Sequence, residues 1–286
     1  MPPVRLLLIA LTAVLTMSLV PVLVKLVSAN ETTIAVARLA IGIAFFTPLA
    51  LKGGQLRGLP KKDWLTLLVI GLVFAVHWQT YFMSIKLAGA GLGAMAISTY
   101  GMQYLVLAWA INKEPISAVE WCAVVVCMAA CVVAAPSLTL SNQVAQGLAI
   151  GLFTAFLYAL MPLLHQRIAH LSTSVRTWGQ FSFAMLGFAF FLPVTQWQLT
   201  PQDWIYLSVL GVVSTVVAHS LWIKASTEMP PLFTSVIYYL YLPSAMIQAA
   251  YFADEPLDTQ KSLAAGMIVV ASVGITYYRW RRQVSV

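Results

Sequence analysis

Residues 63–71 read DWLTLLVIG and residues 203–211 read DWIYLSVLG, so one apolar stretch occurs twice in the chain. Each copy begins with an Asp-Trp pair and has a glycine eight residues after the aspartate. The next apolar stretch ends at Glu114-Pro115 after the first copy and at Glu255-Pro256 after the second. Asp203 follows Asp63 by 140 residues, and Glu255 follows Glu114 by 141 residues. We call the distance of 141 residues the repeat interval. We infer an internal duplication of about half the chain, which decides the fold before any other feature.

The composition identifies the class of protein. Of the 286 residues, 60% are apolar and only 9% are charged, whereas soluble domains carry roughly 25% charged residues. The chain is therefore expected to be an all-α integral membrane protein whose surroundings are a lipid bilayer. The net charge of +7 is not interpreted as a nucleic-acid-binding surface, and no nucleic-acid partner is expected.

Ten stretches have the length and apolarity of a membrane-spanning helix, which needs about 20 residues. Turn-rich, basic or proline-containing segments separate them, and no connection is long enough for a soluble domain. The expected spans are 5–26, 32–51, 64–86, 92–112, 118–136, 146–168, 174–195, 204–225, 232–253 and 261–279.

The positions of Lys and Arg predict the orientation, because cytoplasmic loops are enriched in these residues. With the N-terminus inside, twelve basic residues face the cytoplasm, and three, Lys25, Lys86 and Lys261, face the opposite side. Arg38 lies within the second span. Both termini are therefore expected to be cytoplasmic, in a multi-pass protein of the cell inner (cytoplasmic) membrane.

The duplication and the helix count together predict an inverted repeat. We expect residues 1–140 to form the first five-helix repeat and residues 141–286 the second. Because five is odd, the second repeat enters the membrane from the opposite side. Inverted repeats of this kind are typical of secondary transporters, whose substrate site lies near the midplane between the repeats.

Two inverted five-helix repeats with Glu-Pro at the ends of the fourth and ninth spans resemble the drug/metabolite transporter superfamily, in its ten-helix EamA-type branch. Leu242-Pro243 matches a proline that is common in this branch, whereas Met102 occupies the corresponding place in the first repeat. The resemblance implies a ten-helix bundle with a cavity lined by spans 1, 3, 4, 6, 8 and 9. It also implies a small-molecule substrate, and the aromatic amino acid exporters of the branch are the most similar in kind.

The expected function is outward transport of small organic metabolites by alternating access, with amino acids, aromatic ones among them, as the leading substrates. Efflux of drugs or toxic compounds and uptake of metabolites are alternatives with the same fold. A membrane sensor or partner protein that transports nothing is the alternative from a different class. No catalytic constellation and no ATP-binding loop is present in the sequence, so neither an enzyme nor a cofactor is expected, and protons remain a candidate coupling ion.

Arg38 is the ionisable residue deepest in a span, and such residues are rarely accidental. Its guanidinium could bind a carboxylate or another anion through two parallel hydrogen bonds. Alternatively it could extend to the membrane interface or pair with Glu31, seven residues earlier. We prefer the second interpretation.

Histidine, aromatic and neutral polar residues near the middle of the spans predict a substrate site. His77 and His219 lie in the corresponding third and eighth spans, where either could bind substrate, carry a proton or hold a neighbouring helix. Tyr100 and Tyr241 are separated by the repeat interval and lie too deep for an interfacial aromatic belt. The candidate cavity residues are His77, Trp78, Tyr81, Ser98, Tyr100, Gln103, His219, Trp222, Tyr238, Tyr241 and Arg38.

Three prolines inside spans are candidate hinges, because proline interrupts the hydrogen bonding of a helix. They are Pro21, Pro162 and Pro243, and the first two occupy the same place in corresponding spans, one repeat interval apart. Cys122, Cys127 and Cys131 fall within one span and suit helix packing. With no His-x-x-x-His pair in the chain, no metal site is expected.

Overall fold

The computed structural model describes residues 4–52, 54, 56–113, 115–135, 142–228 and 237–284. The first repeat consists of α1 (Val4–Met17), α2 (Leu19–Leu26), α3 (Glu31–Lys52), α4 (Lys61–Ala88), α5 (Ala90–Ser98), α6 (Tyr100–Asn112) and α7 (Ala118–Ala134). The second consists of α8 (Gln143–Gln166), α9 (Thr173–Phe188), η1 (Ala189–Val194), α10 (Pro201–Val209), η2 (Leu210–Val217), α11 (Ala218–Glu228), α13 (Tyr241–Phe252) and α14 (Thr259–Val284).

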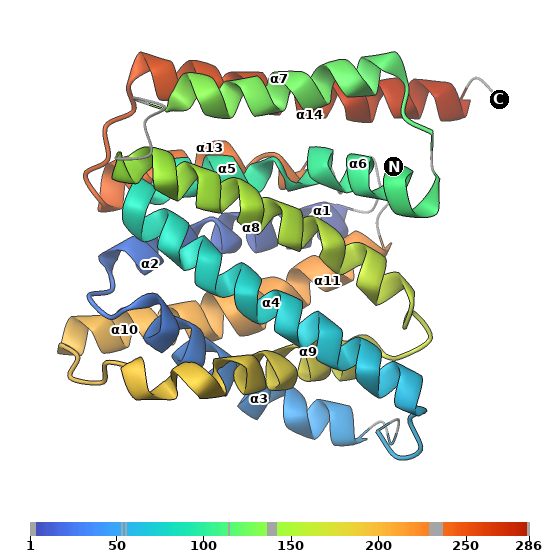
Figure 1. Ribbon diagram of the computed structural model, residues 1–286, viewed down its shortest axis with the longest axis vertical. Coiled ribbons are helices and arrows are strands. Elements are labelled where there is room, and N and C mark those ends of the chain that lie inside the picture. Colours follow the sequence, from blue (N-terminus) through green and yellow to red (C-terminus); the bar gives the residue numbers. More distant parts are fainter. Residues whose placement is uncertain are drawn as a thin grey trace.

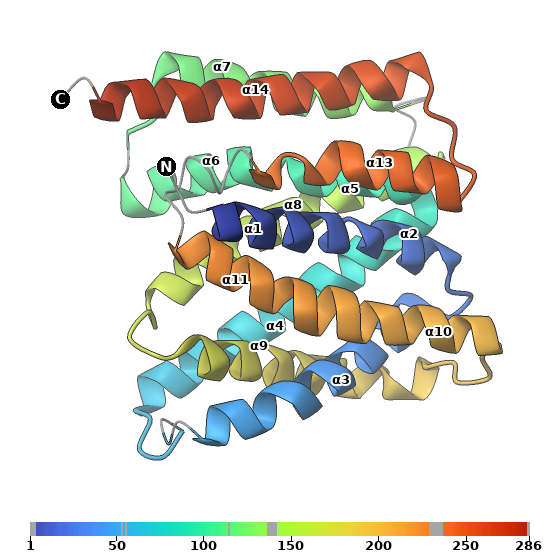
Figure 2. The same cartoon turned by 180° about the vertical axis from the view of Figure 1, so that it is seen from behind.

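Ten helical segments cross the described structure side by side, and the expected all-α fold is confirmed (Figure 1). Eight of them are long and apolar enough to span a membrane, and Ala118–Ala134 is a shorter apolar helix. The expected start of the ninth span, at residue 232, lies outside the described residues. Both ends of the described chain lie at the same end of the bundle, as an even number of crossings requires (Figures 1 and 2).

Helix formation follows from the absence of water in a bilayer, where each backbone N–H and C=O must be bonded within the chain. Side chains cap the starts of several helices, and two of these caps are capping boxes. Ser117 and Glu120 form a capping box at the start of α7, and Thr200 and Asp203 form one at the start of α10. These pairs bond the backbone N–H groups that have no partner in the first turn of a helix.

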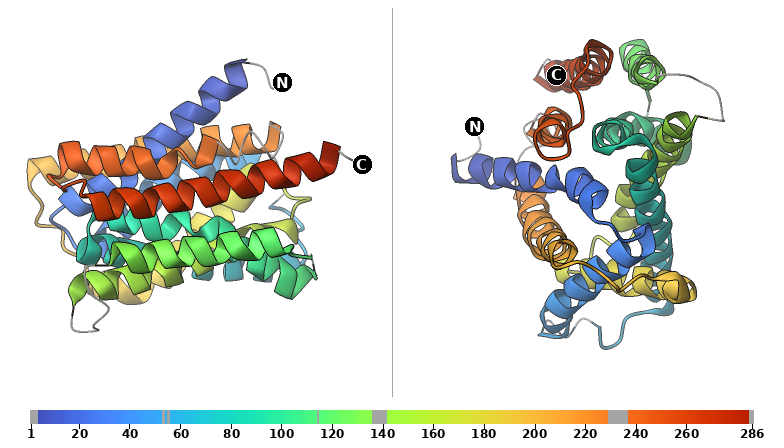
Figure 3. Two further views of the ribbon diagram at one scale, coloured as in Figure 1. Left: turned by 90° about the horizontal axis from the view of Figure 1, so that it is seen from above. Right: turned by 90° about the vertical axis from the view of Figure 1, so that its left-hand side faces the viewer.

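The two repeats interlock through symmetric contacts. In the first repeat, α4 packs against α8 and α9, and in the second, α11 packs against α1 and η2 against α3. Three further pairs join corresponding helices: α3 with α9, α5 with α13, and α7 with α14. The last pair lies side by side at the edge of the bundle, apart from the other helices (Figure 3). This pattern is what a pseudo-twofold axis between the repeats produces.

The backbone carries the same symmetry. Lys113 and Asp254 are the described non-glycine residues with positive φ, at 60° and 49°, and each precedes a Glu-Pro pair. The fourth and ninth spans are interrupted at Thr99 (φ −73°, ψ −9°) and Leu240 (φ −68°, ψ −14°). Both pairs of positions are separated by the repeat interval, so the repeats share local conformation as well as helix order.

The Asp-Trp motif also has a structural explanation. Asp63 Oδ2 lies 2.8 Å from His170 Nε2, beyond the end of α8. Asp203 accepts hydrogen bonds from the backbone N–H and the hydroxyl of Ser28, each at 2.8 Å. Each aspartate therefore binds the segment after the first span of the other repeat, and the two contacts hold opposite ends of the bundle.

The glycine of the duplicated stretch permits the closest helix contacts. A Cβ added at Gly71 would lie 2.7 Å from the backbone carbonyl carbon of Phe183 in α9. At the corresponding position in the second repeat, a Cβ added at Gly211 would overlap the side chain of Ile41 in α3. Small residues at these crossings let the helices approach through their backbones.

We expect Gly71→Ala to lower the free energy of unfolding by about 1–3 kcal/mol, because an added methyl group overfills a packed contact. Denaturant unfolding of the purified protein in detergent measures this change. Gly266→Ala in α14 is the matched control, since a Cβ there meets no described atom within 4 Å. Equal losses in the two variants would contradict the role of Gly71 in packing.

Candidate functional site

A cavity of about 50 Å³ lies in the middle of the bundle, between α4 of the first repeat and α8 and α13 of the second. Its wall, as far as the structure describes it, is mostly aromatic and contains one cation and no carboxylate. The lining residues are Met17, Val20, Arg38, Phe74, His77, Trp78, Tyr81, Ile97, Tyr158, Tyr238 and Tyr241.

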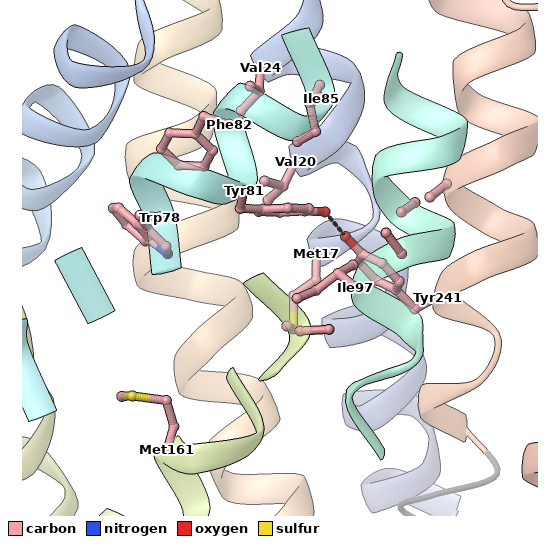
Figure 4. Close-up of a cluster of buried hydrophobic side chains, with 14 of the residues drawn as sticks. Met17, Val20, Val24, Trp78, Tyr81, Phe82, Ile85, Ile97, Met161 and Tyr241 are labelled. Atoms are coloured by element: carbon pink, nitrogen blue, oxygen red, sulfur yellow. Dashed lines mark hydrogen bonds between the residues drawn. The ribbon is translucent and has the colours of Figure 1, made fainter. Parts of the chain in front are cut away.

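Two tyrosines join the repeats across this cavity. The hydroxyl groups of Tyr81 in α4 and Tyr241 in α13 are 2.7 Å apart and hydrogen-bonded (Figure 4). The Tyr241 ring also stacks on Tyr238, with ring centroids 5.8 Å apart. Tyrosine suits this position because its ring packs in an apolar wall while its hydroxyl finds a polar partner.

His77 is held by a backbone group of the opposite repeat. Its Nδ1 lies 3.1 Å from the carbonyl oxygen of Thr154 in α8. A carbonyl oxygen only accepts hydrogen bonds, so Nδ1 carries a proton and donates it. The imidazole ring also stacks on Tyr158, with ring centroids 4.9 Å apart. The histidine therefore has a fixed orientation in the cavity wall.

Arg38 is a deeply buried cation, only 1% exposed. Its Nε donates a hydrogen bond to Thr215 Oγ1 at 3.0 Å, and its Cζ lies 4.2 Å from the centroid of the Trp78 ring. Among the described residues, Nη1 has no hydrogen-bond partner, and none of the ion pairs includes Arg38. The expectation that Arg38 reaches the membrane interface or pairs with Glu31 is wrong, because packing of α3 on α4 and η2 encloses the guanidinium.

The partner of Arg38 lies in a widened turn of the eighth span. The segment η2 is a π-helix, and the Thr215 hydroxyl donates a hydrogen bond at 2.8 Å to the carbonyl oxygen of Leu210, five residues earlier. This bond uses the hydroxyl proton and leaves a lone pair for Arg38. Such π-helical turns are frequent at functional sites.

The structure brings together six of the sequence-predicted site residues. Arg38, His77, Trp78, Tyr81, Tyr238 and Tyr241 line the cavity. Tyr100 and Trp222 form a second layer around it, since both rings pack against Tyr238, at 5.2 and 5.1 Å between centroids.

Two further candidates, Ser98 and Gln103, are not among the lining residues and are bonded elsewhere. The Ser98 hydroxyl donates to the carbonyl oxygen of Ala94 within its own helix, at 2.7 Å. Gln103 donates to Thr99 Oγ1 and to the carbonyl oxygen of Leu152, at 3.0 and 3.2 Å. The side chain of His219 lies outside the described residues.

Sequence reasoning missed Tyr158, which supplies a ring of the cavity wall. Met17 and Tyr158 both line the cavity and occupy corresponding positions in the two repeats, four residues before Pro21 and Pro162. The repeat interval, applied to the residues before these prolines, was the signal that could have identified both.

The three prolines have different surroundings. The first span is interrupted at Ser18, just before Pro21, and Ser18 Oγ lies 2.8 Å from Ser244 Oγ, next to Pro243. In contrast, α8 continues through Pro162 as one helix. The role of the three as hinges stays a prediction.

Glu255 joins three helical segments at the end of the bundle opposite to the chain termini. Its carboxylate accepts hydrogen bonds from the backbone N–H groups of Ala90 and Gly91, at 2.6 and 2.9 Å, at the start of α5. Lys25 Nζ, at the end of α2, lies 2.6 Å from the same carboxylate. A Cβ at Gly89 (φ +94°) would lie 2.7 Å from Glu255 Oε1, so glycine is required there. The negative charge also suits the positive end of the helix dipole, whereas Glu114 lies outside the described residues.

A larger hollow of about 850 Å³ lies between α7 and α14. Its lining is almost entirely apolar and includes Val119, Cys122, Leu263 and Met267. At the edge of the bundle, such a surface suits lipid chains rather than polar chemistry. Within the described residues, no group of three or more His, Cys, Asp or Glu side chains could hold a metal ion.

We expect Tyr81→Phe and Tyr241→Phe each to lower the free energy of unfolding by about 1 kcal/mol, because each leaves one buried hydroxyl without its partner. The double variant should lose less than the sum of the two single losses, since it removes both hydroxyls. Denaturant unfolding of the four proteins in detergent measures this coupling. Strictly additive losses would contradict the hydrogen bond between the repeats.

Comparison with known proteins agrees with the repeat structure. The model of the EamA-like transporter family matches residues 4–135 and again residues 145–277. A solved crystal structure described only as a protein has a TM-score of 0.69 and 16% identity to this chain, and the alignment covers 98% of this chain and 99% of the other. At that identity the likeness shows the fold alone. None of the curated proteins matches the chain. Because the two family matches together cover most of its length, the chain belongs to the EamA-like transporter family of the drug/metabolite transporter superfamily and is a multi-pass membrane transporter rather than an enzyme.

Proposed function

We propose that the protein exports small organic metabolites, foremost aromatic amino acids and related aromatic compounds, across the cytoplasmic membrane by alternating access. The observation that carries this proposal is the central cavity, whose aromatic wall is built from both repeats. Small-molecule sites combine an apolar lining with a few fixed polar groups. Here Tyr81, Tyr241, His77 and Arg38 supply those groups.

The size of the cavity supports a mechanism in which the repeats move. A volume of about 50 Å³ holds one or two water molecules, whereas ligand pockets measure roughly 300–1,000 Å³. The substrate therefore requires a wider space between α4 and α13. The hydroxyl bond between Tyr81 and Tyr241 crosses this boundary and has to break when the cavity widens.

The contacts of Glu255 are suited to a gate between the cavity and this end of the bundle. They join α2, α5 and the end of α13, which belong to three spans around the cavity. With the N-terminus in the cytoplasm, this end of the bundle faces outward. Separation of Glu255 from Lys25 and α5 then opens the cavity to the outside and releases an exported substrate.

We expect purified protein in liposomes to give saturable flux of labelled tryptophan and phenylalanine. Trp78→Ala should lower the flux about tenfold or more, because the variant removes a ring from the cavity wall, and loss of a buried aromatic side chain weakens ligand binding. Trp222→Ala, in the second layer, should have a smaller effect. Trp109→Ala is the matched control, since this side chain is exposed on α6 and is not among the cavity residues.

The alternative functions predict different results in the same assay. Flux of other metabolites alone would keep the transport function and contradict the aromatic substrate. Flux only in the opposite direction would favour uptake. Failure to move any compound of a broad metabolite panel would favour the sensor or partner function.

Histidine is the candidate for proton coupling, because its ordinary pKa lies near neutrality. If His77 or His219 carries the coupling proton, flux of the wild type should respond to an imposed pH gradient. The His77→Gln/His219→Gln variant should lose this response while retaining flux down a substrate gradient. The measurement is initial flux with and without the gradient, and an unchanged response in the variant would exclude both residues as the proton carrier.

A further inference from the structure

Arg38 gives the cavity a positive charge that no carboxylate of the described lining residues balances. The Asp and Glu residues that form ion pairs are committed to other partners near the ends of the spans: Glu255 to Lys25, Asp63 to His170, Glu120 to Arg279 and Asp258 to Lys261. Asp203 is occupied by Ser28 and Thr200. Buried charges in proteins are normally paired, and Arg38 has no acidic partner among the described residues, so a bound ligand is a candidate source of its counter-ion.

The contacts of the guanidinium leave one of its nitrogens without a hydrogen-bond partner among the described residues. Nε is used by Thr215, and one face of the group lies over Trp78 and Phe82, with 4.2 and 5.4 Å from Cζ to the ring centroids. Nη1 is buried and has no hydrogen-bond partner among the described residues. Arg38 also lines the same cavity as the hydroxyl-bearing Tyr81 and Tyr241. A ligand in this cavity therefore meets a charged donor next to two tyrosine hydroxyls.

The second repeat does not supply an equivalent charge. The position that corresponds to Arg38, one repeat interval later, is Gly179, where an added Cβ would lie 2.7 Å from Leu67 Cδ2. The cavity is thus electrostatically one-sided although the fold is symmetric. Among its described lining residues there is no carboxylate to receive an ammonium group.

We propose that Arg38 binds the carboxylate of the transported compound through Nη1, so that the substrates are aromatic compounds that carry a carboxylate, with or without an amino group. This inference rests on the proposed transport function and specifies its substrate class. Hydrogen bonds from an ionised donor to an ionised acceptor are the strong ones. The aromatic wall receives the rest of the molecule, and the Trp78 ring keeps the guanidinium in place.

The test uses phenylalanine and three analogues that each differ from it in one group. Phenylalaninamide replaces the carboxylate by an amide, 2-phenylethylamine lacks the carboxylate, and 3-phenylpropionate lacks the amino group. Binding to the full-length protein in detergent is measured by calorimetry, and flux is measured in liposomes. We expect the two carboxylates to bind about 10- to 100-fold more tightly than the amide and the amine, the range for loss of a charged hydrogen bond. Arg38→Gln should abolish this preference, and Arg38→Lys should keep part of it, because lysine keeps the charge without the planar fork.

The control is Arg282→Gln, which removes an exposed arginine at the end of α14, where its Cζ lies 5.9 Å from the Tyr278 ring. Arg282 is not among the cavity residues, so this variant should leave binding of all four compounds unchanged. Should Arg38→Gln fail to fold, the ligand series on the wild type and on Arg38→Lys still shows whether the carboxylate is preferred and whether Arg38 is responsible.

Two outcomes would overturn the inference. One is equal binding of the carboxylates and the amine by the wild type, and the other is unchanged carboxylate affinity in folded Arg38→Gln. If the amine or the amide is transported as well as the acid, the proposed transport function stands and only the carboxylate requirement fails. If none of the four compounds binds or moves, both the inference and the aromatic substrate class fail.

Discussion

The packing of α4 against α8 and α9 is the contact on which the rest of the structure depends. It places the third span of one repeat between two spans of the other, and its symmetry mate does the same with α11 and η2 against α1 and α3. Neither repeat could bury these faces alone. Gly71 permits close approach to the backbone of α9, and Gly211 leaves room for the Ile41 side chain of α3. Because α4 carries four of the residues that line the cavity, the shape of the cavity depends on this interlocking.

Irregular backbone occurs where the repeats exchange polar contacts. The fourth span is interrupted at Thr99 and the ninth at Leu240, and the eighth contains a π-helical segment. In a bilayer, such departures are tolerated only where protein satisfies the freed groups. The Thr99 hydroxyl bonds the carbonyl of Ala96, and the Thr215 hydroxyl bonds the carbonyl of Leu210. Thr215 also accepts a hydrogen bond from Arg38, so the π-helical segment contacts a residue of the cavity wall.

The cavity combines tyrosines that both repeats supply with a charge that only the first repeat supplies. Tyrosines from both repeats meet at its centre through Tyr81 and Tyr241, whereas the charge comes from Arg38 of the first repeat. An inverted repeat gives two similar ways of opening the cavity, one toward each side of the membrane. Under the proposal that Arg38 binds a carboxylate, this buried cation favours one orientation of the substrate within that symmetric frame. On this proposal, duplication explains the two routes to the cavity, and the divergence at Arg38 and Gly179 explains the preference for a carboxylate.

The sequence by itself determined that the chain is a membrane protein with ten helices and an internal duplication. Apolar runs and helix breaks are local properties, and the duplication is visible as the same residue types recurring at one interval. It also identified Trp78, Tyr81 and Tyr241 from their depth in the spans. It could not decide whether Arg38 reached the interface or the interior, since that depends on how α3 packs on α4 and η2. Tyr158, the interruption at Thr99 and the partner of Glu255 were likewise beyond it, because each is defined by contact between segments distant in the chain. Only the tertiary structure, by closing two repeats around one cavity, decided which polar groups face each other.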